Sequence, residues 1–141
     1  MRIYRSDQPQ PVNSAARKPE PIVIPPFYFR GSLQASTSGK WYPPFSMRLT
    51  GGYITTSTAG STSVTFTALK NNIFETTGSF YPPATAATAV LAASDKKSIF
   101  SLASHIGGAI IFTHYDWITI NANASSGHVN ATVQLYGERI N

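Results

Sequence analysis

The sequence predicts an all-β protein: a single antiparallel β-sandwich of jelly-roll type, preceded by an extended, proline-rich N-terminal arm. Three observations lead to this prediction. Charged residues make up only 12% of the 141 residues, about half of the usual share, while Ser, Thr, Gly, Pro and Ala are abundant. Short stretches alternate large apolar and small polar residues, as half-buried strands do. Six of the ten prolines lie within the first 26 residues.

Residues 1–26 form the predicted arm. Proline fixes φ and removes a backbone donor, so this stretch cannot form a helix or a central strand. It also carries apolar and basic side chains that a solvated tail, the alternative interpretation, does not need. A stiff segment loses little entropy when it docks, so we expect the arm to lie on neighbouring subunits or other proteins rather than on its own sandwich. The candidate contact residues are Ile3, Tyr4, Arg5, Arg17, Lys18, Ile22, Val23 and Ile24.

The sandwich domain is predicted to cover residues 27–141, and its first strand residues 27–35. The apolar side chains of this strand alternate and therefore share one face. They are Phe27, Phe29, Leu33 and Ala35. A turn follows at residues 37–40, and Pro43 and Pro44 then exclude a ladder position.

The second predicted strand spans residues 45–56. Gly51 and Gly52 in its middle indicate a bulge or a close approach of another backbone. The third predicted strand spans residues 63–70 and alternates in the same way as the first. The side chains on its apolar face are Val64, Phe66 and Ala68.

Asn71 and Asn72 follow the third strand. Because asparagine tolerates positive φ, this pair predicts a tight hairpin into a strand at residues 73–76. Further on, residues 84–93 fit either a strand or a short helix, and periodicity does not separate the two.

Residues 97–104 and 109–115 are predicted strands. The most regular alternation lies in residues 116–120 and 129–135, which residues 121–127 join. We expect these two strands to form an antiparallel hairpin. Seven or eight short strands at this spacing fit a sandwich, whose predicted core includes Phe29, Leu33, Phe66, Ile118, Ile120, Val133 and Leu135.

The residues that could carry chemistry are few. His114 and Asp116 lie two positions apart and would share a face on a strand, where a metal could use both. No convincing third ligand accompanies them, and residues 37–41 lack both the first glycine and the final hydroxyl of a phosphate loop. The sequence therefore predicts a protein that is not an enzyme and needs no cofactor or metal.

The net charge of +5 raises the question of nucleic acid, but the basic residues are spread thinly and form no stripe with interleaved aromatics. Nucleic acid is not an expected partner. The chain has no cysteine, no apolar leader and no segment of membrane-spanning length. We expect no membrane contact and a protein made in a cytoplasm.

Trp41 and Tyr42 lie in the proline-rich loop. Exposed aromatic side chains can form a platform for sugar rings, which makes this pair a candidate glycan site. The alternative is that the two side chains cap one end of the sandwich or pack against another subunit.

Several short motifs occur in an order that resembles the β-sandwich domains of tailed-bacteriophage appendage and accessory proteins, such as fibre head domains, minor tail proteins and head decoration proteins. The resemblance covers residues 27–141. Its motifs are Phe27-Tyr-Phe-x-Gly-x-Leu33, Gly39-Lys-Trp-Tyr-x-Pro44, the loop around Gly60, Leu69-Lys70-Asn71-Asn72, Asp116-x-Ile-Thr-Ile120 and Gly127-x-Val-x-Ala-Thr-Val-Gln-Leu135.

The resemblance implies a homotrimer without catalytic residues. Many such domains follow a long stalk, whereas here a short proline-rich arm takes its place, which favours a small protein fixed directly to the particle. We therefore expect a virion structural protein, bound to major capsid or tail proteins through its arm and displaying its sandwich as a head decoration or minor tail protein. The alternative is a module of a tail tip or fibre that binds a carbohydrate or receptor, such as a host surface glycan.

Overall fold

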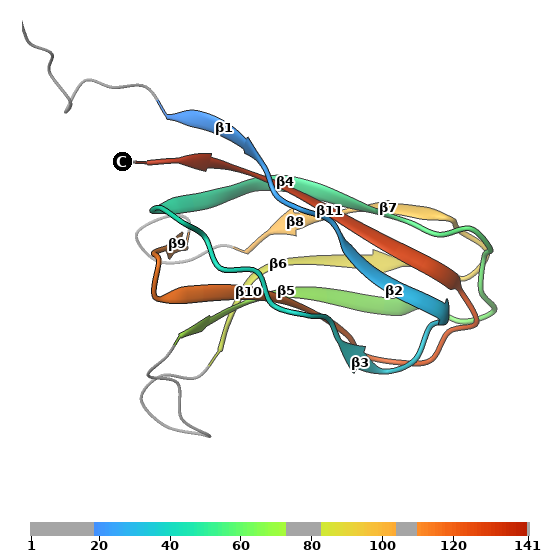
Figure 1. The fold of residues 1–141 in the computed structure, drawn as a ribbon. Helices are drawn as coiled ribbons and strands as arrows, with labels where there is room; N and C mark the ends of the chain where they lie inside the picture. The colour runs from blue at the N-terminus through green and yellow to red at the C-terminus, as the bar shows by residue number, and fades with distance from the viewer. Residues whose placement is uncertain (1–18, 73–82, 104–109, 141) are drawn as a thin grey trace, which may run out of the picture.

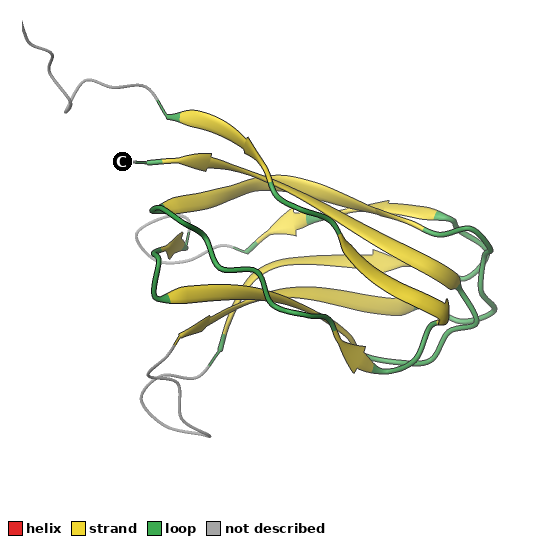
Figure 2. Ribbon diagram, viewed as in Figure 1, coloured by secondary structure: helices red, strands yellow, loops and turns green. Residues whose placement is uncertain are grey.

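The computed structural model describes residues 19–72, 83–103 and 110–140. Within these ranges there is no helix, and the strands form two antiparallel sheets that face each other (Figures 1 and 2). The all-β prediction is confirmed. In the same ranges, no helix is long and apolar enough to cross a membrane.

One sheet, here called sheet A, has six strands. They are β1 (Glu20–Val23), β2 (Phe27–Ser32), β4 (Met47–Thr55), β7 (Lys97–Ile99), β9 (Ile111–Phe112) and β11 (Val129–Arg139). Strand β11 is central: β1 and β2 pair with successive parts of it, and β4 pairs with it as well. Strands β7 and β9 both pair with β4.

The other sheet, sheet B, has the order β3-β10-β5-β6-β8. Its strands are β3 (Ser36–Thr37), β5 (Val64–Asn72), β6 (Ala84–Leu91), β8 (Ser101–Leu102) and β10 (Asp116–Ala122). Residues 84–91 are thus a strand, which decides between the two structures that the sequence allowed.

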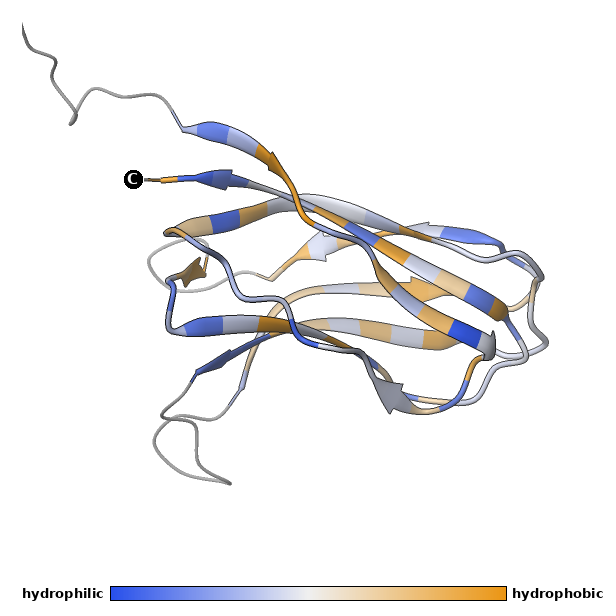
Figure 3. Cartoon of the chain, viewed as in Figure 1, coloured by the Kyte–Doolittle hydropathy of each residue, from blue (hydrophilic) through white to orange (hydrophobic). Residues whose placement is uncertain are grey.

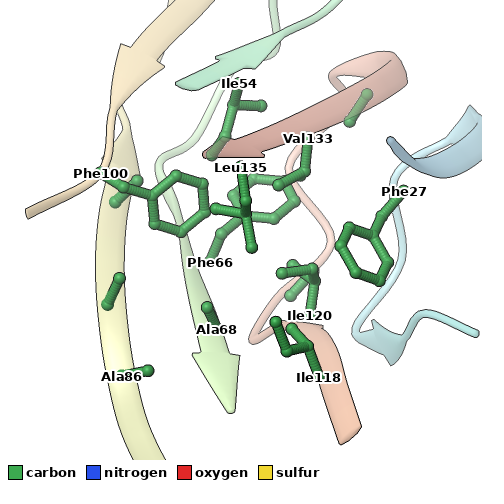
Figure 4. Close-up of a cluster of buried hydrophobic side chains, with 14 of the residues drawn as sticks. Phe27, Ile54, Phe66, Ala68, Ala86, Phe100, Ile118, Ile120, Val133 and Leu135 are labelled. Atoms are coloured by element: carbon green, nitrogen blue, oxygen red, sulfur yellow. The ribbon is translucent and has the colours of Figure 1, made fainter. Parts of the chain in front are cut away.

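The core lies between the two sheets, where apolar and polar residues alternate along the strands (Figure 3). Phe29 of sheet A meets Phe66 of sheet B edge to face, with ring centroids 5.6 Å apart. Figure 4 shows Ile118 and Ile120 of sheet B on the same cluster as Val133 and Leu135 of sheet A. All seven predicted core residues are buried. The alternation therefore identified the inward faces correctly.

Both features predicted for the glycine pair of β4 are present. The register between β4 and β11 shifts near Gly51, which is a bulge. A Cβ on Gly52 would lie 2.6 Å from the carbonyl oxygen of Gln134 and 2.7 Å from Cδ2 of Leu135. Only a residue without a side chain allows β11 to approach this closely.

The predicted terminal hairpin is wrong. Strand β10 belongs to sheet B and pairs with β3 and β5, whereas β11 belongs to sheet A. Residues 123–128 cross from one layer to the other instead of turning back within a sheet. Alternation indicates which face of a strand is buried, but it does not determine which strand pairs with it. Here β10 pairs with β5 and β11 pairs with β4.

The predicted turn at Asn71 and Asn72 is also wrong, because both residues belong to β5 and pair with Trp117 and Asp116 of β10. Neither has positive φ. The Asn71 side chain is buried and donates from Nδ2 to Oγ1 of Thr119 at 2.9 Å. A cross-strand hydrogen bond thus uses the amide that was expected to favour a turn. The strand predicted at residues 73–76 lies outside the described residues.

Other predicted strands are shorter than expected. The first ends at Ser32, next to Gly31 at a φ of 72°, so Leu33 remains buried but Ala35 is exposed. The strand predicted at residues 97–104 divides at Phe100 into β7 of sheet A and β8 of sheet B. Of residues 110–115 only β9 is a strand, and residue 109 lies outside the described part.

Part of the predicted arm lies on the protein's own sandwich. Strand β1 joins the edge of sheet A, Ile22 packs against the core and Ile24 is fully buried. Gln134 donates a hydrogen bond from Nε2 to the carbonyl oxygen of Ile24 at 2.6 Å. For these residues the prediction was wrong, because two isoleucines at alternate positions gain more from the core than from solvent. Pro21 sits in an edge strand, where proline is tolerated. The arm residues Ile3, Tyr4, Arg5, Arg17 and Lys18 lie outside the described residues.

Candidate interaction surface

The outward face of sheet A carries a row of exposed apolar and aromatic side chains, here called the tyrosine row. It consists of Val23, Tyr136, Tyr53 and Ile99, contributed by β1, β11, β4 and β7. Val23 pairs directly with Tyr136, and Tyr53 pairs directly with Ile99. Because directly paired residues share a face, the row runs across the sheet from one edge to the other.

The exposure of these side chains is high for their type. Val23 is 68% exposed and Ile99 is 78% exposed. Tyr53 and Tyr136 are 39% and 37% exposed at the centre of the sheet. Single exposed apolar residues are ordinary on a protein surface, but a contiguous set on one sheet face indicates a binding site.

The two tyrosines contact each other. Their ring centroids are 6.2 Å apart with an interplanar angle of 35°. The hydrogen bond with the Tyr53 side chain raises the pKa of the Tyr136 phenol above its usual 10.0, and desolvation and the charge of Tyr53 act in the same direction. The pair presents two phenol hydroxyl groups and two aromatic rings to its surroundings.

An open glycine position and a groove flank the tyrosines. Gly51 pairs with Tyr136, and no atom lies within 4 Å of the position that a Cβ on Gly51 would take. A groove of about 530 Å³ lies beside Tyr53. It is lined by Tyr53, Thr55, Lys97, Ser98 and Ile99. The surface can thus receive protruding side chains as well as present its own.

The tyrosine row contains no charge. Lys97 lies next to the row, where it lines the groove beside Tyr53. At the end of β11, Arg48 pairs with Glu138, and Arg139 with Glu20 at 3.9 Å. Charged residues are depleted at the centres of protein–protein interfaces, whereas tyrosine is enriched there. The chemistry of this face fits a protein partner.

The two residues of the predicted glycan platform, Trp41 and Tyr42, have different environments. Trp41 is partly buried against the core and exchanges two backbone hydrogen bonds with Ile118, of 3.1 and 2.9 Å. Tyr42 is exposed and contacts Trp117 at a centroid distance of 5.4 Å. Trp41 thus serves packing, and the aromatic partner of Tyr42 is a residue of β10.

The sequence reasoning missed Trp117 and the two tyrosines of the row for the same reason, whereas Val23 was already a candidate contact residue. Each of these aromatic residues stands at an outward position of its strand, next to one buried apolar residue: Ile118, Ile54 or Leu135. The ring of Trp117 is contacted by Tyr42 and by Lys40, whose Nζ lies 4.6 Å from the ring centroid. Large aromatics at outward positions were the signal that could have found both groups.

His114 and Asp116 do not form a shared site. Asp116 is buried and accepts a hydrogen bond from the backbone N–H of Thr113 at 2.7 Å, while Lys70 Nζ lies 3.8 Å from its carboxylate. His114 is exposed, in the turn before β10, and stacks on Tyr115. Across the described ranges no three His, Cys, Asp or Glu side chains are grouped as a metal site.

His128 is fully buried at the opposite end of the sandwich. Its Nε2 faces the carbonyl oxygens of Ala92 and Asp95 at 3.2 and 3.1 Å, and its Nδ1 lies 2.6 Å from Oγ of Ser126. Because carbonyls only accept, Nε2 carries the hydrogen and Nδ1 can accept from the Ser126 hydroxyl. The imidazole thus ties the loop before β7 to the crossing between β10 and β11.

Comparison with known proteins adds no relative: no family model matches the chain, and a search of curated proteins found no match.

Proposed function

We propose that this protein is a non-enzymatic structural protein of a tailed-bacteriophage particle, which forms a homotrimer and stands on the particle surface as a head decoration or minor tail protein. The observation that carries the proposal is the tyrosine row. A protein that works by assembly needs an uncharged, partly apolar surface directed at other proteins. The tyrosine row supplies four uncharged, exposed side chains of this kind on the outward face of sheet A.

The strand order supports the jelly-roll type of sandwich that is frequent in viral capsid proteins. Within the six-stranded and the five-stranded sheet run the four-strand orders β2-β11-β4-β7 and β3-β10-β5-β6, which are those of the two layers of a jelly roll. The chain changes layer from β2 to β3, from β3 to β4, from β4 to β5 and again from β10 to β11. In a jelly roll the last two strands likewise belong to opposite layers, as β10 and β11 do.

Attachment to the particle is assigned in this proposal to residues 1–18. These residues precede β1 in the sequence, and Val23 of β1 belongs to the tyrosine row. The candidate contacts are Ile3, Tyr4, Arg5, Arg17 and Lys18. Their apolar side chains would be buried against a major capsid or tail protein, and their basic groups would bond acidic or carbonyl groups there.

Binding of a host glycan has weaker support. A sugar platform needs a free aromatic face, whereas Trp41 packs inward and the Trp117 ring is contacted by Tyr42 and Lys40. The alternative function therefore rests on Tyr42 alone.

The test is localisation in purified particles. We expect the epitope-tagged full chain to co-purify with intact particles and to occupy a fixed surface position in electron micrographs, with three copies at each position. A variant lacking residues 1–18 is expected to fold but to be lost from the particles. Absence of the full chain from purified particles would reject the proposed function, and normal incorporation of the shortened chain would reject the role of the arm.

A further inference from the structure

The inward face of sheet B ends in three polar side chains that lie together. Asp116 of β10 pairs directly with Asn72 of β5. Lys70 lies two positions before Asn72 on the same face of β5, opposite the fully buried Ile118. The side chain of Asp116 is 2% exposed and that of Lys70 is 29% exposed. An amine, a carboxamide and a carboxylate are therefore held next to each other at the end of the core, largely screened from water.

The carboxylate of Asp116 contacts both of the other groups. Its Oδ1 accepts a hydrogen bond from Nδ2 of Asn72 at 2.5 Å, and its Oδ2 lies 3.8 Å from Nζ of Lys70. Thr113 holds the carboxylate in this position, because its backbone N–H and its hydroxyl donate to Oδ2 at 2.7 and 3.1 Å. One carboxylate oxygen thus faces the amine and the other faces the amide nitrogen. This is the placement that a carboxyl group needs to pass protons from one to the other.

Lys70 can also reach the carboxamide itself. A strand rises about 3.4 Å per residue, so the Cα atoms of Lys70 and Asn72 are about 7 Å apart. Their side chains project from the same face, and the flexible four-carbon stem of lysine spans most of that separation. The ion pair with Asp116 already directs Nζ toward the Asn72 side of the cluster.

From these contacts we propose that Lys70 forms an amide bond with the side chain of Asn72. The Lys70 ammonium gives one proton to the Asp116 carboxylate, and the neutral amine attacks Cγ of Asn72. Two protons in all pass from Nζ through the carboxylate to Nδ2, the bond between Cγ and Nδ2 breaks, and ammonium leaves. Asp116 ends as the carboxylate that it was at the start, and no oxidant, cofactor or second protein is needed.

The fold supplies the rate advantage for this step. Groups that are held in position react with effective molarities of about 10⁵–10⁸ M, whereas a free amine and a free carboxamide do not combine at a useful rate in water. The event occurs once within each chain, so it is a self-modification and not the turnover of a substrate. It goes beyond the proposed function and does not depend on it.

The mass of the intact chain tests the bond. We expect the purified full chain to be lighter than its sequence mass by one ammonia. Trypsin does not cleave after an acylated lysine, so Lys70 and Asn72 should be found in one peptide that carries the same loss. The matched variant is Lys70→Arg, which keeps the positive charge beside Asp116 but presents a guanidinium that is always protonated and therefore not nucleophilic. It should have the full sequence mass and remain folded in a thermal unfolding measurement.

Two further variants test the specificity of the bond and the role of the carboxylate. Lys97→Arg replaces a lysine of sheet A and should retain the loss of ammonia. Asp116→Asn should have the full mass, because it removes the group that carries the protons. Loss of ammonia in this variant would overturn the role given to Asp116.

The bond itself is rejected by any of three results. The first is a full sequence mass for the folded, unsubstituted chain, which would mean that Lys70 and Asp116 form an ion pair and nothing more. The second is a loss of ammonia that persists in Lys70→Arg, since an asparagine that cyclises on its own backbone gives the same mass. The third is a loss of water in place of ammonia, which would join Lys70 to Asp116 and not to Asn72.

Discussion

The backbone of Gly60 lies against the buried imidazole of His128: a Cβ on Gly60 would stand 2.5 Å from Nδ1 and 2.6 Å from the backbone nitrogen of His128. Because the neighbouring atoms are backbone as well as ring, they cannot move aside. We expect Gly60→Ala to lower the free energy of unfolding by about 1–3 kcal/mol through overpacking. Chemical denaturation measures this, with Gly39→Ala as the control, since no atom lies within 4 Å of a Cβ there. Equal stability of the two variants would contradict the packing described.

Replacement of the imidazole itself tests its structural role. His128→Ala leaves the Ser126 hydroxyl and the carbonyl of Asp95 without their partner and opens a void. We expect a loss of about 2–4 kcal/mol in the free energy of unfolding. The exposed His114 is the comparison residue, and His114→Ala should change stability by less than about 0.5 kcal/mol. If His128→Ala left the free energy of unfolding unchanged, the imidazole would not be needed to hold the two loops together.

Truncation of Ile118 or Leu135 probes the two inward faces separately, because Ile118 belongs to sheet B and Leu135 to sheet A. Both are fully buried. Each change to alanine is expected to cost about 2–5 kcal/mol, as for other large-to-small substitutions in packed cores. Urea denaturation monitored by tryptophan fluorescence is suitable. Losses below about 1 kcal/mol at both positions would show that the inward faces are assigned wrongly.

Two N-terminal deletions separate the strand from the residues before it. Removal of residues 1–24 takes away β1 and the buried Ile24, whereas removal of residues 1–18 takes away neither. We expect the longer deletion to be less stable than the shorter one by about 2–5 kcal/mol, the cost of losing a buried isoleucine and an edge strand. Ile24→Ala in the full chain is the matched point change. Identical melting temperatures for the two deletions would show that β1 adds nothing to the sandwich.

Much of the fold follows from local pattern. Val64, Phe66 and Ala68 are inward because a strand has a period of two, and that period is a property of the backbone. The place of β10 and β11 in opposite sheets could not be read in the same way. Strand partners are set by which faces can be buried together across the whole chain, so two strands that follow each other in sequence need not pair.

The functional surface was harder to predict than the core. Tyr53 and Tyr136 are separated by 83 positions, and only the pairing of β4 with β11 brings them together. Trp41 was selected because it stands beside prolines, but its backbone pairs with Ile118 of β10 and its side chain packs against the core. A residue's exposure is decided by its neighbours in space, which a single sequence does not list.

The passage of the chain through Phe100 has a mechanical consequence. Strand β7 ends at Ile99 in one layer and β8 begins at Ser101 in the other, with one buried aromatic residue between them. The N–H of Phe100 is bonded to the carbonyl of Gly52 at 2.9 Å, and that of Ala103 to Ala86 at 2.9 Å. Tension applied to one layer along this part of the chain reaches the other through a link of one residue. Separating the two layers at this point therefore requires the hydrogen bonds of Phe100 to Gly52 and of Ala103 to Ala86 to break.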